Sequence, residues 1–205
     1  MTHARADGVA ATVETCPHYL FLDESALQRH GPFAKINPPL RPRETVDALW
    51  ERVRAGDVDV IGSDHSPFLV EEKAPFAEDI WPASPGTPGL EAMLPLLLTA
   101  VVEERLRPEQ LVALSSANAA RIFGLAGKGR LEEGADADLA LVSLGEPSRI
   151  DTSRWLSRSR GTARIWEGRE VRGRVLATYV RGRWVWDAKA GLVGEAGWGR
   201  QVRPS

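Results

Sequence analysis

The sequence predicts an α/β fold followed by a β-rich part. Before about Gly124, short apolar and β-branched runs alternate with amphipathic segments, a pattern typical of parallel α/β sheets and barrels. After Gly124 the pattern changes to short β-type runs separated by glycine. Hydrophobic residues make up 43% of the 205 residues and charged residues 26%, which indicates a folded globular chain rather than a disordered one.

The first part contains two expected strands, at residues 9–14 and 58–61. Helices are expected at residues 23–29, 43–55, 89–105, 108–115 and 117–123. The helix at 43–55 has the clearest pattern, because Val46, Trp50 and Val53 recur at helical spacing and Gly56 follows its end. The Pro-rich stretch from Ser66 to Pro88 is long enough to suggest a functional lid.

Two parallel strands are too few for a complete sheet or barrel. An eight-stranded barrel takes about 250 residues, and barely half that number precedes Gly129. We therefore expect a fragment, or a fold that other chains complete. Open strand edges and an uncovered apolar face would make the isolated chain associate or aggregate. The residues expected to be uncovered are Val9, Val13, Val58, Val60 and Ile61, together with part of the helix at 89–105.

The second part begins near residue 128. We divide the chain into residues 1–127 and 128–205, because β-rich runs fill 129–144 and 164–187. The stretches at 171–175 and 179–185 predict a hairpin system, and the stretch from Gly191 predicts an extended tail.

Charge is unevenly distributed along the chain. The formal net charge is −2, yet residues 154–205 hold 12 basic and only 4 acidic side chains. Such an imbalance can mark a nucleic-acid-binding arm, and the tryptophans at 155, 166, 184, 186 and 198 could stack on bases. The arginines alternate with apolar residues as in half-buried strands, which favours docking on the acidic part and core packing.

Several protein classes do not fit the sequence. No apolar run approaches the roughly 18 residues of a membrane-spanning helix, and the N-terminus lacks the apolar centre of a signal peptide. A single cysteine, Cys16, excludes an internal disulfide and a multi-cysteine zinc site. We expect a cytoplasmic protein that contacts neither membrane nor nucleic acid.

Asp64 is the leading candidate for chemistry. It follows the expected strand at 58–61, and catalytic side chains of α/β barrels project from such strand ends. A carboxylate there can bind a metal or accept a proton from water. His65 follows directly, Gly62 permits close backbone approach, and Pro67 fixes the exit from the strand.

Two further segments carry candidate ligand-binding residues. His18 lies at the end of the first strand and could contact a ligand, although a structural histidine is the commoner case. Cys16 could be a nucleophile, but no partner base is evident and a buried inert thiol is favoured. Asn37 precedes Pro38 and Pro39, whose rigidity could hold its amide for a ligand or simply shape a turn.

An ordered series of motifs resembles one family. ETCPHYL, KINPPLRP, DVIGSDHSPF and PGTPGLEAMLPL occur in the first part, and SANAARIFGL, KGRLEEGADADLALV and EGREVRGRVLATYVRG complete the series. The series is similar to the C-terminal portion of the cyclic amidohydrolases: dihydroorotases, allantoinases and hydantoinases. The resemblance covers about residues 4–200.

The resemblance implies the last two strands and helices of a (β/α)8 TIM barrel, followed by part of a small β-sandwich. It also implies a zinc centre of one or two ions in a hydrolase that opens cyclic amides or ureides. The matching residue for metal binding and for shuttling the proton to the leaving nitrogen is Asp64. Asn37, His18 and Gly86 match substrate-binding positions, while His65 and Pro67 are expected to support the site structurally.

The family's other metal ligands have no counterpart in this chain. They are an HxH pair, usually a carboxylated lysine, and two further histidines. We therefore expect a truncated member, a split-gene product or a gene begun at an internal Met, inactive alone and a poor zinc binder. A non-catalytic assembly module of the same fold is the alternative.

The motifs divide between two substrate classes. NPPLR and PGxxGLE favour a dihydroorotase of pyrimidine metabolism, which we rank first. SDHSPF and ETCPHYL favour an allantoinase or hydantoinase, and Phe68 stands where dihydroorotases typically have a second histidine. The complete enzyme is expected to be a homo-oligomer.

Overall fold

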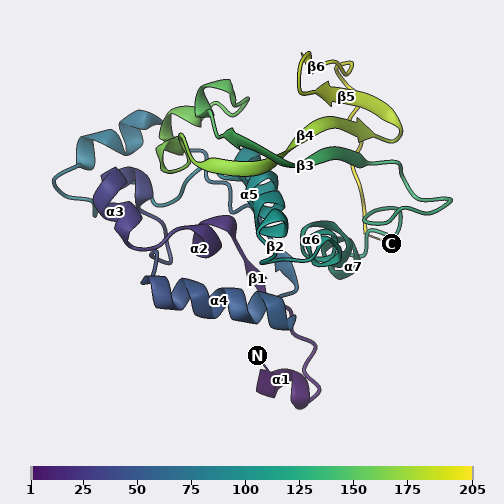
Figure 1. Ribbon diagram of the computed structural model, residues 1–205, viewed down its shortest axis with the longest axis horizontal. Coiled ribbons are helices and arrows are strands. Elements are labelled where there is room, and N and C mark those ends of the chain that lie inside the picture. The colour runs from purple at the N-terminus through teal and green to yellow at the C-terminus, as the bar shows by residue number, and fades with distance from the viewer. Residues whose placement is uncertain (1, 205) are drawn as a thin grey trace.

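The computed structural model describes residues 2–204, and its first part is a small parallel sheet surrounded by helices (Figure 1). The elements of this part are α1 (Thr2–Ala6), β1 (Glu14–Thr15), α2 (Pro17–Phe21), α3 (Ser25–His30), the 3₁₀ turn η1 (Gly31–Ala34), α4 (Arg43–Ala55), β2 (Val60–Ile61), the 3₁₀ turns η2 (Val70–Glu72) and η3 (Ala74–Phe76), α5 (Leu90–Val102), α6 (Pro108–Val112), the π-helical turn η4 (Ala113–Ala117) and α7 (Asn118–Ile122).

The second part is a four-stranded antiparallel sheet in the order β3-β4-β5-β6. Its elements are β3 (Leu139–Arg149), the 3₁₀ turns η5 (Thr152–Arg154) and η6 (Arg160–Ile165), β4 (Glu170–Val180), β5 (Arg183–Asp187) and β6 (Gly191–Leu192). Figure 1 shows β3 and β4 crossing one end of α5, with α4 on the opposite side of the molecule. The boundary at 127/128 stays a prediction.

The strands β1 and β2 pair in parallel, with Glu14 opposite Val60 and Thr15 opposite Ile61. The expected strand at 9–14 is wrong in extent, since only its last residue is in β1. A strand needs a continuous ladder with a neighbour, and the segment before β1 makes other contacts: the Val13 carbonyl accepts hydrogen bonds from the backbone N–H groups of Asp59 and Val60 at 2.9 and 3.2 Å. The carboxylate of Asp59 accepts a hydrogen bond from the Val13 backbone N–H at 2.7 Å and pairs with Arg5.

Helix α4 matches the predicted range. Val46, Trp50 and Val53 are all buried, and Gly56 ends the helix in the left-handed conformation with φ of 81°. The Trp50 indole N–H donates to the Leu20 carbonyl at 2.6 Å, which joins α4 to α2. Local spacing and a glycine stop therefore suffice to specify this helix.

Helix α5 is buried on several sides and forms the centre of the core. Leu96, Leu97 and Leu98 are each at most 1% exposed, because β4 packs on one side of the helix and α2 on another. The expectation that the strand residues Val60 and Ile61 would be uncovered is wrong: they are 9% and 1% exposed. Val58 is likewise buried, whereas Val9 is exposed as expected and Val13 is half-buried.

The loop at 66–88 is tied to the rest of the chain rather than free. The Lys73 side chain is fully buried and its Nζ donates to the Pro32 carbonyl at 3.0 Å. In the opposite direction, Lys35 Nζ donates to the carbonyls of Trp81 and Ala83 at 2.5 and 2.7 Å. These reciprocal contacts between lysine ammonium groups and backbone carbonyls fix the path of this segment, whose length suggested a lid.

The β-rich part differs in detail from the expectation. Residues 170–180 form one long strand, and the hairpin turn lies at Arg181 and Gly182, both with positive φ as two-residue hairpin turns require. The stretch from Gly191 begins with the short strand β6 rather than a tail. Trp155 and Trp166 are buried in the core, as favoured over base stacking, while Trp184 is 45% exposed. No helix in residues 2–204 is both long and apolar enough to cross a membrane.

Replacing Trp166 tests how the second part is joined to the first. The Trp166 side chain is fully buried, and its indole N–H donates to the Pro88 carbonyl at 3.0 Å. Trp166→Phe should lower the free energy of unfolding by about 2–3 kcal/mol, because it leaves a cavity and an unpaired buried carbonyl. Urea unfolding measures the change. The control is Trp81→Phe, at a side chain 82% exposed, which should change stability by less than about 0.5 kcal/mol. Equal effects of the two variants would contradict this role.

Candidate metal site and active site

Three potential ligands meet where β1 and β2 end. Cys16 and His18 follow β1, and Asp64 follows β2 after two residues. One ligand atom from each of Cys16, His18 and Asp64 lies within 4.8 Å of the others. The parallel pairing brings the carboxyl ends of both strands to one edge, so residues 46 or more positions apart in sequence become neighbours.

His18 is buried without a hydrogen-bond partner. Its side chain is 1% exposed, and neither ring nitrogen has a partner among the described residues. Its Nε2 lies 3.5 Å from Asp64 Oδ2. Burial lowers the pKa of His18 to about 4, against the opposing effect of the Asp64 charge. The imidazole is therefore neutral at pH 7, the form in which histidine binds metals.

Asp64 is presented at the open side of this cluster. Its side chain is 46% exposed, and its backbone has φ of 45°, a left-handed conformation uncommon outside glycine. Such conformations cost free energy and concentrate at functional sites. In this conformation the carboxylate lies 3.5 Å from the His18 ring.

Cys16 was not among the expected site residues. Burial, together with the carboxylates of Asp64 and Glu14, raises the pKa of its thiol to about 12, so the thiol is protonated and a poor nucleophile at pH 7. This agrees with the inert thiol favoured from the sequence. The sequence nevertheless gave a sign of its position, since Cys16 and His18 flank one proline at a strand end.

Asn37 lies on an exposed loop that Tyr19 connects to the cluster. The Tyr19 hydroxyl donates to the Pro38 carbonyl at 2.9 Å, and its ring stacks edge-on against His18 with centroids 4.2 Å apart. Burial and the nearby Asp64 and Cys16 raise the pKa of Tyr19 to about 12, so this donor keeps its proton. Tyr19 thus positions the Asn37 loop, a role that sequence reasoning missed.

His65, Pro67 and Gly86 are not members of the three-ligand cluster. His65 Nδ1 accepts hydrogen bonds from the backbone N–H groups of Gly89 and Leu90 at 3.3 Å, which ties the end of β2 to the start of α5. Pro67 is exposed. Gly86 is buried with φ of 132°, and a Cβ there would lie 2.4 Å from the Ser66 Cβ, so packing alone requires glycine.

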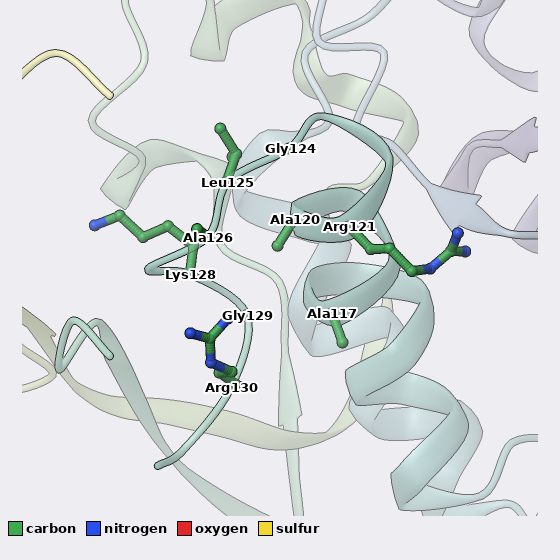
Figure 2. Close-up of a pocket in the computed structure, with 9 residues that line it drawn as sticks. All are labelled: Ala117, Ala120, Arg121, Gly124, Leu125, Ala126, Lys128, Gly129 and Arg130. Atoms are coloured by element: carbon green, nitrogen blue, oxygen red, sulfur yellow. The ribbon is translucent and has the colours of Figure 1, made fainter. Parts of the chain in front are cut away.

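A hollow of about 350 Å³ lies elsewhere, between α7 and the segment 124–130 (Figure 2). Figure 2 shows the side chains of Arg121 and Lys128 extending in opposite directions, away from each other. Lys128 is paired with Asp136 at 2.8 Å and with Asp138. No acid, histidine or cysteine is among the residues described as lining the hollow, so it offers no group for metal or acid–base chemistry.

The cluster fits a metal ion in the chemistry of its donors. A neutral imidazole, a carboxylate and a thiol are the three side-chain types that bind zinc, and catalytic zinc sites use about three protein ligands. Both nitrogens of the buried His18 ring lack a hydrogen-bond partner among the described residues, so one of them is available to bind a metal ion.

The sequence model of the amidohydrolase family matches residues 2–185. The chain belongs to the amidohydrolase family. An allantoinase from Rubrobacter xylanophilus is 49% identical over 204 residues, covering 98% of this chain and 43% of the relative. A dihydroorotase from Methanosphaera stadtmanae is 37% identical over 185 residues, covering 89% of this chain and 41% of the relative.

The solved structure of L-hydantoinase (dihydropyrimidinase) from Arthrobacter aurescens superimposes with a TM-score of 0.91 at 36% identity, covering 98% of this chain and 44% of that one. The α/β fold expected from the sequence is confirmed as part of an amidohydrolase TIM-barrel enzyme. This amidohydrolase chain spans less than half the length of the relatives it matches.

Replacing His65 tests whether this histidine has a structural role that is distinct from the cluster. Because His65→Ala removes the acceptor for two N–H groups at the start of α5, it should lower the free energy of unfolding by about 1 kcal/mol. Thermal or urea unfolding measures this. His30→Ala is the control, since His30 is half-buried and ends α3 away from these groups. A His65→Ala chain as stable as the control would argue against the bracing role.

Proposed function

We propose that this chain supplies part of the active site of a metal-dependent hydrolase that opens cyclic amides or ureides. The observation that carries the proposal is the Asp64 carboxylate, exposed at the end of β2 beside the neutral imidazole of His18. Membership of the amidohydrolase family, with relatives named allantoinase, dihydroorotase and L-hydantoinase, supports the same reaction class.

The chemistry requires a proton carrier at the position of Asp64. Hydrolysis adds water to the ring carbonyl carbon and breaks the ring C–N bond, so one proton must move from the water to the ring nitrogen. Asp64 can accept that proton and deliver it, since its carboxylate is accessible. A bound divalent cation supplies polarisation of the carbonyl and a lowered pKa of water. Zinc is the proposed ion, with Asp64 as one ligand.

Asn37, His18 and Gly86 are proposed to contact the substrate. Asn37 lies on a loop made rigid by two prolines and attached to Tyr19, so its amide can hydrogen-bond ring carbonyl or N–H groups with little loss of entropy. His18 is close enough to Asp64 to line the same space, and Gly86 lies beside Ser66 in the loop after β2.

We rank an allantoin-type ureide first, which reverses the order favoured from the motifs. The 49% identity to an allantoinase over nearly the whole chain supports this order, as does Phe68, an apolar residue where dihydroorotases typically have a histidine. Dihydroorotate is the second candidate, supported by NPPLR and by several dihydroorotase relatives.

The proposal also covers the remaining metal ligands, the cellular location and the oligomeric state of the complete enzyme. We propose that polypeptide corresponding to the rest of the relatives supplies the other metal ligands, and that the complete enzyme is a cytoplasmic homo-oligomer. The non-catalytic assembly module is less favoured, because such a module has no need for Asp64 in a left-handed conformation beside a buried, unpartnered histidine.

The test of Asp64 uses a chimera in which this chain replaces the matching 43% of the Rubrobacter allantoinase. In the chimera, Asp64→Asn should lower kcat for allantoin by about 10²- to 10⁴-fold, because an amide neither accepts the proton nor binds metal as an anion. His30→Gln is the matched control and should keep kcat. Near-normal turnover by the Asp64→Asn chimera would reject the assignment, and faster opening of dihydroorotate than of allantoin would reverse the substrate order.

Asn37→Ala in the same chimera should act on binding rather than on chemistry. Loss of one hydrogen bond to an uncharged group costs about 0.5–1.5 kcal/mol, which corresponds to a decrease of about 2- to 13-fold in kcat/KM. The expected change lies mainly in KM, because Asn37 is outside the proton path. Steady-state kinetics at saturating zinc distinguish this from a fall in kcat alone, which would contradict a binding role.

A further inference from the structure

We propose that Cys16, His18 and Asp64 together bind a thiophilic divalent cation in this chain by itself. All three donors belong to the described residues, so the inference does not depend on the proposed hydrolase activity or on other polypeptide. It departs from the expectation that the chain binds zinc poorly, which counted Asp64 as the only available ligand, and it assigns His18 of the isolated chain to the metal rather than to a substrate.

The spacing of the donors suits a small coordination sphere. Ligand atoms of a tetrahedral zinc-type site lie roughly 3.3–3.8 Å apart, given metal–sulfur and metal–nitrogen bonds of about 2.3 and 2.0 Å. Here the three atoms lie within 4.8 Å of one another, and the contact between His18 Nε2 and Asp64 Oδ2 is already 3.5 Å. The carboxylate of Asp64 is partly exposed, so it is the donor free to adjust.

The buried imidazole is an independent observation that points to a ligand. A buried polar side chain without a partner is rare, and leaving one costs about 1–3 kcal/mol. His18 is 1% exposed and lacks a partner on both nitrogens, although Asp64 and Cys16 are near. A cation bound through one nitrogen would give that nitrogen a partner without requiring the ring to be protonated.

The backbone holds two of the donors in place. Pro17 is the first residue of α2, and Cys16 caps that helix from an extended conformation, so the residue on each side of Pro17 has a fixed direction. The Tyr19 ring packs against His18. Such a site loses little conformational entropy when it binds an ion.

A thiol among the donors selects soft cations. Thiolate and imidazole together favour zinc, cadmium and mercury over magnesium and calcium, which prefer oxygen ligands. On binding, the S–H bond of Cys16 breaks, a metal–sulfur bond forms, and the proton passes to solvent. No electron is transferred, so no oxidant or reductant is needed.

The test titrates the metal-free 205-residue chain with Cd²⁺. We expect one ion per chain, an ultraviolet thiolate-to-cadmium charge-transfer band, and a ¹¹³Cd NMR shift typical of one sulfur with nitrogen and oxygen ligands. Cys16→Ser should abolish the band, and His18→Gln should weaken affinity by more than about tenfold, since loss even of supporting contacts costs 10- to 100-fold. His30→Gln should bind as the unaltered chain does, and Mg²⁺ should not compete.

Several results would overturn the proposal. They include absence of the band in the unaltered chain, unchanged affinity in Cys16→Ser, and equal affinities in His18→Gln and His30→Gln. The ¹¹³Cd shift of the unaltered chain reports the ligands even if a variant fails to fold, and a shift typical of oxygen ligands alone would also reject the site. An inactive chimera, together with a Cys16-dependent cadmium band in the 205-residue chain, would count against the proposed function and leave this inference standing.

Discussion

The parallel pairing of β1 with β2 is the constraint on which the candidate site depends. Only two residues on each strand take part, with Glu14 opposite Val60 and Thr15 opposite Ile61. This register places the residues after each strand at one edge, and a shift by one position would turn their side chains to the other face. The pair owes its stability to its surroundings, because an isolated two-stranded sheet is marginal in water. The turn η4 packs against β2, and Ile61 lies in the same buried cluster as apolar residues of α4 and α5.

Helix α5 links the paired strands β1 and β2 to the second part of the chain. Its start is joined to the end of β2 through His65, and its middle packs under β4. Thr99, near the end of the helix, accepts a hydrogen bond from the Arg172 backbone N–H at 2.8 Å while donating to the Pro95 carbonyl. One helix thus connects the strand end that carries Asp64 to the antiparallel sheet, which gives the β-rich part a role in holding the site.

Elements specified by nearby residues could be predicted from the sequence, whereas features that depend on distant pairing could not. Helix α4 was correct at both ends because spacing and a glycine stop are local. The first strand was wrong in extent because a ladder depends on a neighbour, and α2 was missed although Pro17 marks its first turn. Asp64 and His18 are each candidates from the sequence alone, but their contact at 3.5 Å depends on strand register. The proximity of Cys16 to Asp64 likewise depends on tertiary contacts that a linear sequence does not display.

The contacts of Lys35 and Lys73 fix the path of the loop at 66–88 through backbone carbonyls. They do not involve its exposed side chains. Lys35 and Lys73 bind main-chain carbonyls, which every residue type provides, rather than particular side chains. The side chain of Trp81 projects into solvent while its own carbonyl is held. The outer face of this loop can therefore diversify among homologues, or carry an attached probe, while the polypeptide keeps the same course past the strand ends.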